Sequence, residues 1–154
     1  MLDTRKTTPG FRFFEKWAVM IGGGINHRFG LFDKILIKDN HIDFAGGIAN
    51  AIDACNSYLK KNKLNLKIEI EVRNRAELDQ VLAKGGINRI MLDNFSIKEM
   101  REAVALISGR YEIEASGNIT LDTIRAYAET NVDFVSVGAL THQIKSLDLS
   151  LKAI

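Results

Sequence analysis

The chain has 154 residues, 46% of them hydrophobic, and a formal net charge of +2. A chain of this length buries roughly 70% of its extended surface, enough for one domain with a hydrophobic core. The low net charge argues against nucleic-acid binding. No apolar run approaches the ~20 residues of a membrane span, and no signal-peptide pattern opens the chain. The single Cys55 excludes an intramolecular disulfide, and we expect it to be a buried thiol. We therefore expect a cytoplasmic protein.

Short apolar strands alternate with helical patterns along the chain. We predict strands at residues 2–6, 34–38, 67–72, 89–92, 112–115 and 134–137. The predicted helices cover residues 11–21, 44–61, 75–83, 97–107 and 121–129. From Leu140 onward the pattern allows a further helix but does not require one. Ser96 and Thr120 are the predicted N-caps, and Gly85 and Asn131 the predicted helix stops. This alternation is typical of βα units with parallel strands, and no linker divides residues 1–154, so we predict a single domain.

The polar residues within the strands decide between two α/β architectures. At 67–72, Ile68, Ile70 and Val72 share one face, and Glu69 and Glu71 share the other. Residues 111–116 alternate in the same way. A sheet with helices on both faces has nearly continuous apolar strands. The alternation therefore favours a parallel (β/α) barrel with a polar centre, although six strands leave it incomplete.

Permanent cations are concentrated in the first quarter of the chain. Arg5, Lys6, Arg28 and Lys38 suit a small ligand with several negative charges, because Arg binds carboxylate or phosphate through two parallel N–H bonds and Lys adds a point charge. His27 is either a further donor to a ligand carboxylate or an ordinary solvated histidine. We place neither of the other two histidines at the site. The histidines and the cysteine lack the spacing of zinc ligands.

The loops after the last two predicted strands carry small residues. The first contains Ser116, Gly117 and Asn118, and the second begins with Gly138. Glycine after a strand and before a helix lets backbone N–H groups approach phosphate, and these loops of a barrel often bind it. The alternative is a pair of ordinary tight turns.

Carboxylates end two neighbouring strands. Glu71 and Asp93 can accept hydrogen bonds from ribose hydroxyls or hold Mg²⁺ beside a substrate phosphate. The alternative is a buried ion network with nearby cations, and both arrangements can hold in the absence of ligand. Glu69 and Glu114 are predicted to belong to such a network, deeper in the barrel.

Three strings carry a family resemblance. TRKTTPG at 4–10, NHRFGLFDKILIKDNH at 26–41 and VGALTH at 137–142 resemble quinolinate phosphoribosyltransferase (decarboxylating), also called nicotinate-nucleotide pyrophosphorylase (carboxylating). The resemblance covers nearly the whole chain. It implies a TIM-like barrel of the type II phosphoribosyltransferase kind and a pentosyltransferase activity in NAD biosynthesis. In that reaction, phosphoribosyl pyrophosphate and quinolinate give nicotinate mononucleotide, pyrophosphate and CO2.

The resemblance also implies roles for individual residues. It places Arg5, His27, Arg28 and Lys38 at the carboxylates of quinolinate, and Lys6 at the pyridine and pyrophosphate end. It places Glu71 and Asp93 near the ribose hydroxyls and Mg²⁺, and Ser116, Gly117, Asn118 and Gly138 around the 5′-phosphate. Lys6, Lys38, Glu71 and Asp93 are the implied catalytic group. Asn118 departs from the family, which often has glycine there.

Members of the family carry an N-terminal domain before the Thr-Arg-Lys-Thr motif, and it lends an arginine to the neighbouring subunit's site. We therefore expect residues 1–154 to be the barrel portion alone, in a homodimer or higher homo-oligomer, with quinolinate bound weakly by this portion. Two alternatives stay open. One is an inactive barrel that binds a phosphorylated metabolite or a partner subunit. The other is a molybdenum-transport-associated relative with another pyridine-like substrate.

Overall fold

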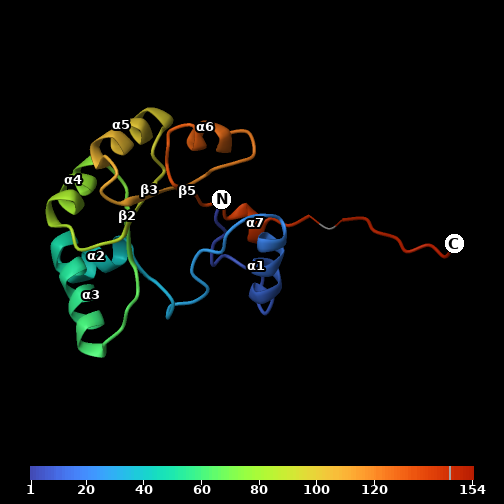
Figure 1. Cartoon of the computed structure of the whole chain (residues 1–154), viewed down its shortest axis with the longest axis horizontal. Helices are drawn as coiled ribbons and strands as arrows, with labels where there is room; N and C mark the ends of the chain where they lie inside the picture. Colours follow the sequence, from blue (N-terminus) through green and yellow to red (C-terminus); the bar gives the residue numbers. More distant parts are fainter. Residues whose placement is uncertain (146) are drawn as a thin grey trace.

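The computed structural model describes residues 1–145 and 147–154 and shows a parallel five-stranded sheet with strand order β1-β2-β3-β4-β5 (Figure 1). The strands are β1 Ile35–Ile37, β2 Ile68–Val72, β3 Arg89–Asp93, β4 Glu112–Ser116 and β5 Phe134–Val135. The helices are α1 Arg12–Ile21, α2 Asp39–Ala45, α3 Ile48–Asn62, α4 Arg75–Lys84, α5 Ile97–Ile107, α6 Ile124–Ala128 and α7 Ala139–His142. The predicted α/β class with parallel strands is confirmed.

The sheet continues beyond β5 through two short segments of the amino-terminal part. Leu2 forms parallel bridges with Ser136 on one side and Ile25 on the other. Its N–H donates to the carbonyl of Val135 at 2.8 Å, and its carbonyl accepts from the N–H of Val137 at 3.0 Å. The wall of the barrel therefore runs from β1 to β5 and then through residues 2 and 25. This is the incomplete barrel that the alternation predicted.

Two predicted strands are too long. The strand predicted at 2–6 is reduced to the bridges of Leu2, because the chain turns at once. The N–H of Thr7 donates to the carbonyl of Arg5 at 3.0 Å, and the N–H of Lys6 to Oγ1 of Thr4 at 3.1 Å. The strand predicted at 134–137 keeps two residues and the bridge at Ser136.

The helix predicted over 44–61 is wrong: two helices, α2 and α3, occupy this region. Gly46 and Gly47 separate them with φ angles of 77° and 130°, which lie in the region open to glycine. α2 begins at Asp39, earlier than predicted, with Lys38 as its N-cap.

The last helices are also shorter than predicted. α6 begins at Ile124 with Thr123 as its N-cap, so Thr120 is not the cap. Past Leu140 the only helix in the described residues is the four-residue α7. The predicted cap at Ser96 is confirmed, because Ser96 and Glu99 form a capping box.

The sheet has an apolar outer face and a polar inner face. Ile70, Ile90 and Ala115 lie on the outer face and are fully buried in one hydrophobic cluster with residues of α3, α4 and α5. Figure 1 shows these helices in an arc along one side of the strands. On the inner face, Glu71, Met91 and Glu114 lie side by side in register, with Glu69, Arg89 and Glu112 one row below. The predicted polar centre is therefore present.

Two smaller features complete the fold. Cys55 on α3 is half-buried instead of fully buried, and burial raises the pKa of its thiol. Within the described residues, no helix is long and apolar enough to cross a membrane.

Candidate active site

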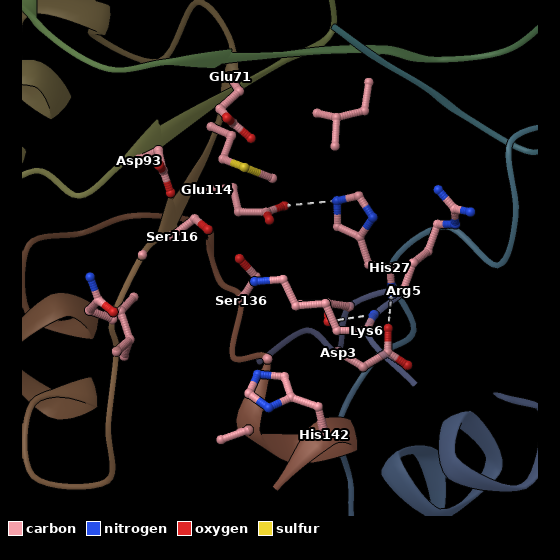
Figure 2. A pocket seen from close by; sticks show the side chains of 18 of the residues that line it. Asp3, Arg5, Lys6, His27, Glu71, Asp93, Glu114, Ser116, Ser136 and His142 are labelled. Carbon is pink, nitrogen blue, oxygen red and sulfur yellow. Dashed lines mark hydrogen bonds and ion pairs between the residues drawn. The ribbon is translucent and has the colours of Figure 1, made fainter. Parts of the chain in front are cut away.

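A pocket of about 660 Å³ opens at the carboxyl ends of the strands (Figure 2). Every residue that the sequence singled out for the site lines it: Arg5, Lys6, His27, Arg28, Lys38, Glu71, Asp93, Ser116, Gly117, Asn118 and Gly138. They come from the turn after Leu2, the loop before β1, the ends of β1 to β4 and the loop after β5. The structure thus brings together residues that lie up to 133 positions apart in the chain (138 − 5 = 133).

Two arginines, Arg5 and Arg28, line the pocket close enough for their charges to interact. Arg28 donates to the carbonyl of Lys34 at 3.4 Å. Burial, and then the positive charge of Arg5, lower the pKa of the Arg28 guanidinium. Among the described residues, the buried Nε of Arg5 has no hydrogen-bond partner. Neighbouring cations with an unused donor are stabilised by an anion, because its charge offsets their repulsion and its oxygens accept the free N–H.

The lysines of the pocket are held differently. Lys38 directly follows β1 and forms an ion pair with Glu71, so this part of the predicted ion network is present. Its backbone N–H donates to Nδ1 of His41 at 2.9 Å, which fixes the start of α2. The backbone of Lys6 is tied to α7, because Oγ1 of Thr141 donates to the Lys6 carbonyl at 2.7 Å.

His27 is buried, with Nδ1 in a hydrogen bond and Nε2 within ion-pair distance of two carboxylates. Its Nδ1 accepts the backbone N–H of Arg28 at 2.8 Å, so the ring proton belongs on Nε2. Nε2 lies 3.0 Å from Oε2 of Glu69. It also lies 3.4 Å from Oε2 of Glu114, a contact that Figure 2 shows. Burial lowers the pKa of His27, but Glu114 and Glu69 outweigh it and raise the pKa overall. The solvated-histidine alternative is wrong, and a ligand carboxylate could gain Nε2–H only in competition with these glutamates.

Glu69 and Glu114 form the floor beneath His27. Lys34 lies 3.0 Å from Oε2 of Glu69, and Arg89 lies 3.1 Å from Oε2 of Glu114. Burial raises the pKa of Glu69, but its hydrogen bond with His27, the charge of His27 and then that of Lys34 lower it to about 2. These carboxylates belong to the predicted ion network deeper in the barrel.

The His27, Glu69 and Glu114 ligand atoms lie within 4.8 Å of one another, a spacing that a metal ion could use. The chemistry does not fit a metal. Nδ1 accepts a hydrogen bond from the Arg28 N–H, so Nε2 carries the ring proton and has no lone pair for a metal. Two cations already approach the carboxylates. We assign the cluster to an ion network.

The glycine loops approach their neighbours closely. Gly117 has a φ of 94°, and a Cβ there would lie 2.7 Å from the backbone nitrogen of Asn94. A Cβ on Gly138 would lie 2.6 Å from Nε2 of His142. The first loop therefore requires glycine at 117, whereas a side chain at 138 would displace the ring of His142. Asn94 and His142 also line the pocket, and the sequence analysis did not place them there. Asn94 could have been recognised from the sequence, because it directly follows Asp93, a carboxylate at the end of a strand.

Fold and site together define an α/β-barrel protein with a pocket lined by arginines and lysines at the carboxyl ends of its strands. The chain belongs to the quinolinate phosphoribosyl transferase family, because that family's C-terminal domain matches residues 1–152. A curated relative, quinolinate phosphoribosyltransferase [decarboxylating] 1b from Nicotiana tabacum, is 49% identical over 99% of this chain and 47% of the relative.

Two further relatives agree with this assignment. The probable nicotinate-nucleotide pyrophosphorylase [carboxylating] of Bacillus subtilis is 44% identical over 97% of this chain and 50% of its own length. The solved structure of the nicotinate-nucleotide pyrophosphorylase from Francisella tularensis matches with a TM-score of 0.90 and 50% identity, over 97% of this chain and 51% of that one. The chain spans about half the length of the relatives that it matches.

Proposed function

We propose that this pocket is the phosphoribosyl-transfer site of a decarboxylating quinolinate phosphoribosyltransferase, a pentosyltransferase that makes nicotinate mononucleotide in NAD biosynthesis. One observation carries the proposal: two neighbouring guanidinium groups share a single pocket with two glycine loops and two strand-ending carboxylates, and one guanidinium has a buried Nε with no partner among the described residues. Membership of the family and the names of the relatives support it.

The proposed reaction needs charge neutralisation more than a nucleophile. The pyridine nitrogen of quinolinate attacks C1′ of the ribose, and the bond to pyrophosphate breaks. The 2-carboxylate then leaves as CO2, the electron pair stays on C2, and C2 takes up a proton. Arg5, Arg28 and Lys38 are proposed to hold the two carboxylates, and Lys6 to face the leaving pyrophosphate. Such a site accelerates the reaction by orientation and by electrostatic stabilisation.

The chemistry of the donor set fits Mg²⁺ bound together with phosphoribosyl pyrophosphate. Asp93 is half-exposed at the pocket, and Glu71 lies one strand away on the neighbouring β2. Mg²⁺ is usually held by one or two carboxylates together with substrate phosphates, and it supplies charge neutralisation to the leaving group. Asp93 and Glu71 are the residues proposed to hold Mg²⁺. The carboxylate of Glu71 would then contact both Mg²⁺ and Lys38.

We also propose that the chain works as a homo-oligomer. Helix α1 supports this proposal, because Phe13, Phe14, Trp17, Met20 and Ile21 are each more than half exposed. An apolar patch of this kind is typical of a protein interface. We propose a cytoplasmic location as well. The name of the related enzyme from Arabidopsis thaliana assigns that protein to the chloroplast, so family membership alone does not define the compartment.

The test is turnover with quinolinate, phosphoribosyl pyrophosphate and Mg²⁺, with nicotinate mononucleotide followed by mass spectrometry. We expect Lys38→Ala to abolish product, and the matched Lys98→Ala on the exposed face of α5 to leave it unchanged. Binding of phosphoribosyl pyrophosphate without turnover would favour the alternative of a barrel that binds a phosphorylated metabolite. Absence of binding by a chain shown to be folded would refute the proposal.

A further inference from the structure

Two asparagines connect the carboxylate at the end of β3 with the glycine loop after β4. Nδ2 of Asn94 donates to Oδ2 of Asp93 at 2.8 Å. Nδ2 of Asn118 donates to Oδ1 of Asn94 at 3.0 Å. All three residues line the pocket, and the strand ends that carry them are neighbours, as Asp93 and Ser116 show in Figure 2. We call these three residues the amide relay.

The carboxylate defines the direction of the amide relay. An ionised aspartate only accepts hydrogen bonds, so Asn94 must turn its NH2 group toward Asp93 and its oxygen away. The oxygen of Asn94 in turn requires a donor, and the NH2 group of Asn118 supplies it. Each amide therefore has one orientation that satisfies its neighbour. As a result, one oxygen of Asp93 is engaged by Asn94 and the other stays available to a ligand.

The backbone holds the amide relay in place. Asn94 and Asn118 have φ angles of 57° and 49°, a left-handed conformation that asparagine tolerates better than most residues. The N–H of Asn94 donates to the carbonyl of Ser116 at 2.9 Å. Gly117 packs so closely against Asn94 that a Cβ would overlap the asparagine side chain. Asn94 is therefore fixed between its own strand and the neighbouring loop.

We propose that Asn94 and Asn118 are positioning residues, which orient Asp93 and couple it to the proposed phosphate loop. This inference rests on the proposed function, because it assigns the ribose and Mg²⁺ end of the substrate to Asp93. Asn118 then contributes to substrate affinity through Asp93 and not through contact with the ribose. The ligand that this arrangement suits carries both a phosphate and a diol bound to a metal ion.

The decisive experiment is a double-mutant cycle on the affinity for phosphoribosyl pyrophosphate with Mg²⁺, measured by calorimetry. Asn118→Gly keeps the left-handed backbone and removes the amide. We expect about a fivefold loss of affinity, the size typical of one hydrogen bond. In an Asp93→Ala background, the same substitution should change affinity less than twofold. Equal losses in both backgrounds would overturn the proposal, because Asn118 would then act independently of Asp93.

Two further variants control for folding and for polarity. Asn131→Gly makes the same substitution at another left-handed asparagine, outside the pocket, and should leave affinity unchanged. Asn118→Asp keeps the shape but presents an acceptor to the oxygen of Asn94. It should weaken binding at least as much as Asn118→Gly. Full affinity in Asn118→Asp would contradict the relay.

A measurement without ligand separates this inference from the proposed function. In a nitrogen-15 NMR spectrum of the free chain, Asn118→Gly and Asp93→Ala should each shift the side-chain amide signals of Asn94, and Asn131→Gly should not. Unmoved Asn94 signals would overturn the relay. If the wild-type chain does not bind phosphoribosyl pyrophosphate, the proposed function fails, and the Asn94 signals alone decide whether the relay exists.

Discussion

Both faces of the sheet contain fully buried side chains, but these side chains are stabilised by different forces. On the outer face, Ile70 and Ile90 are completely buried by helices and need no specific partner. On the inner face, Glu69 and Glu114 are just as buried, and each depends on His27 and on a neighbouring lysine or arginine. Apolar burial is insensitive to pH, whereas a buried ion network is lost when one partner changes charge. The comparison separates the part of the molecule that maintains the fold from the part that holds the charges of the site.

The largest effect is expected from breaking the ion network of the inner face. Arg89→Met leaves Glu114 buried without its cation and removes the cation–π contact with Phe134, whose ring centroid lies 3.9 Å from the guanidinium. Loss of one partner of a buried pair costs about 3–5 kcal/mol of unfolding free energy. Urea denaturation at pH 7 measures it. A loss below about 1 kcal/mol would mean that the inner face does not depend on its ion pairs.

A cavity on the outer face should cost somewhat less. Ile90→Ala removes buried methyl groups from the centre of the sheet, and we expect a loss of about 3 kcal/mol. Because no charge is involved, the loss should be the same at pH 7 and pH 5 in urea denaturation. A loss that changed with pH would break the distinction between the two faces.

Acid should affect the inner face first. The pKa of Glu69 is lowered from 4.5 to about 2, so its stabilising contribution is complete above about pH 4.5 and is lost as the pH falls toward 2. The shift corresponds to about 3 kcal/mol across that window. Urea denaturation between pH 5 and pH 3 should show a declining stability in the wild type and a flatter profile in Glu69→Gln. Parallel profiles would contradict the ionised state of Glu69.

The smallest effect is expected at an exposed polar contact of the outer layer. Ser96 caps α5, and Oε2 of Glu99 accepts a hydrogen bond from the Ser96 N–H at 2.8 Å. Ser96→Ala should destabilise the chain by about 1 kcal/mol, the usual cost of a lost N-cap. Thermal unfolding measures this, with the exposed Leu121→Ala as a control that should change little. A loss as large as that of Ile90→Ala would show that the helix layer depends on more than apolar burial.

The sequence predicted the two faces of the sheet, because alternation along a strand is a local property. Glu69 and Glu71 were placed on the polar side from their spacing alone, and the structure has them there. The breaks in regular structure were harder to predict. A single bridging residue such as Leu2 has no periodic pattern, so its strand was drawn too long. The break at Gly46 and Gly47 was missed, because two glycines within a helical pattern do not by themselves identify a new helix start.

The sequence predicted which residues gather at the pocket, but not the contacts that they make there. All the predicted residues line the pocket, since the ends of parallel strands must meet at one edge. Which nitrogen of His27 carries the proton depends on Glu69 and on the backbone of Arg28, which come together only in the folded chain. The amide relay was equally invisible, because Asn94 and Asn118 are 24 positions apart.

The bridges of Leu2 have a consequence for the order of folding. The turn that carries Arg5 and Lys6 follows Leu2, and Leu2 is held by Val135 and Val137 near the other end of the chain. The strands β1 to β4 pair with their nearest neighbours in sequence, and such pairings close smaller loops and form faster. The turn that carries Arg5 and Lys6 is therefore expected to reach its native place only after β5 has joined the sheet. We expect a nascent chain that ends before β5 to have a sheet but no complete anion site.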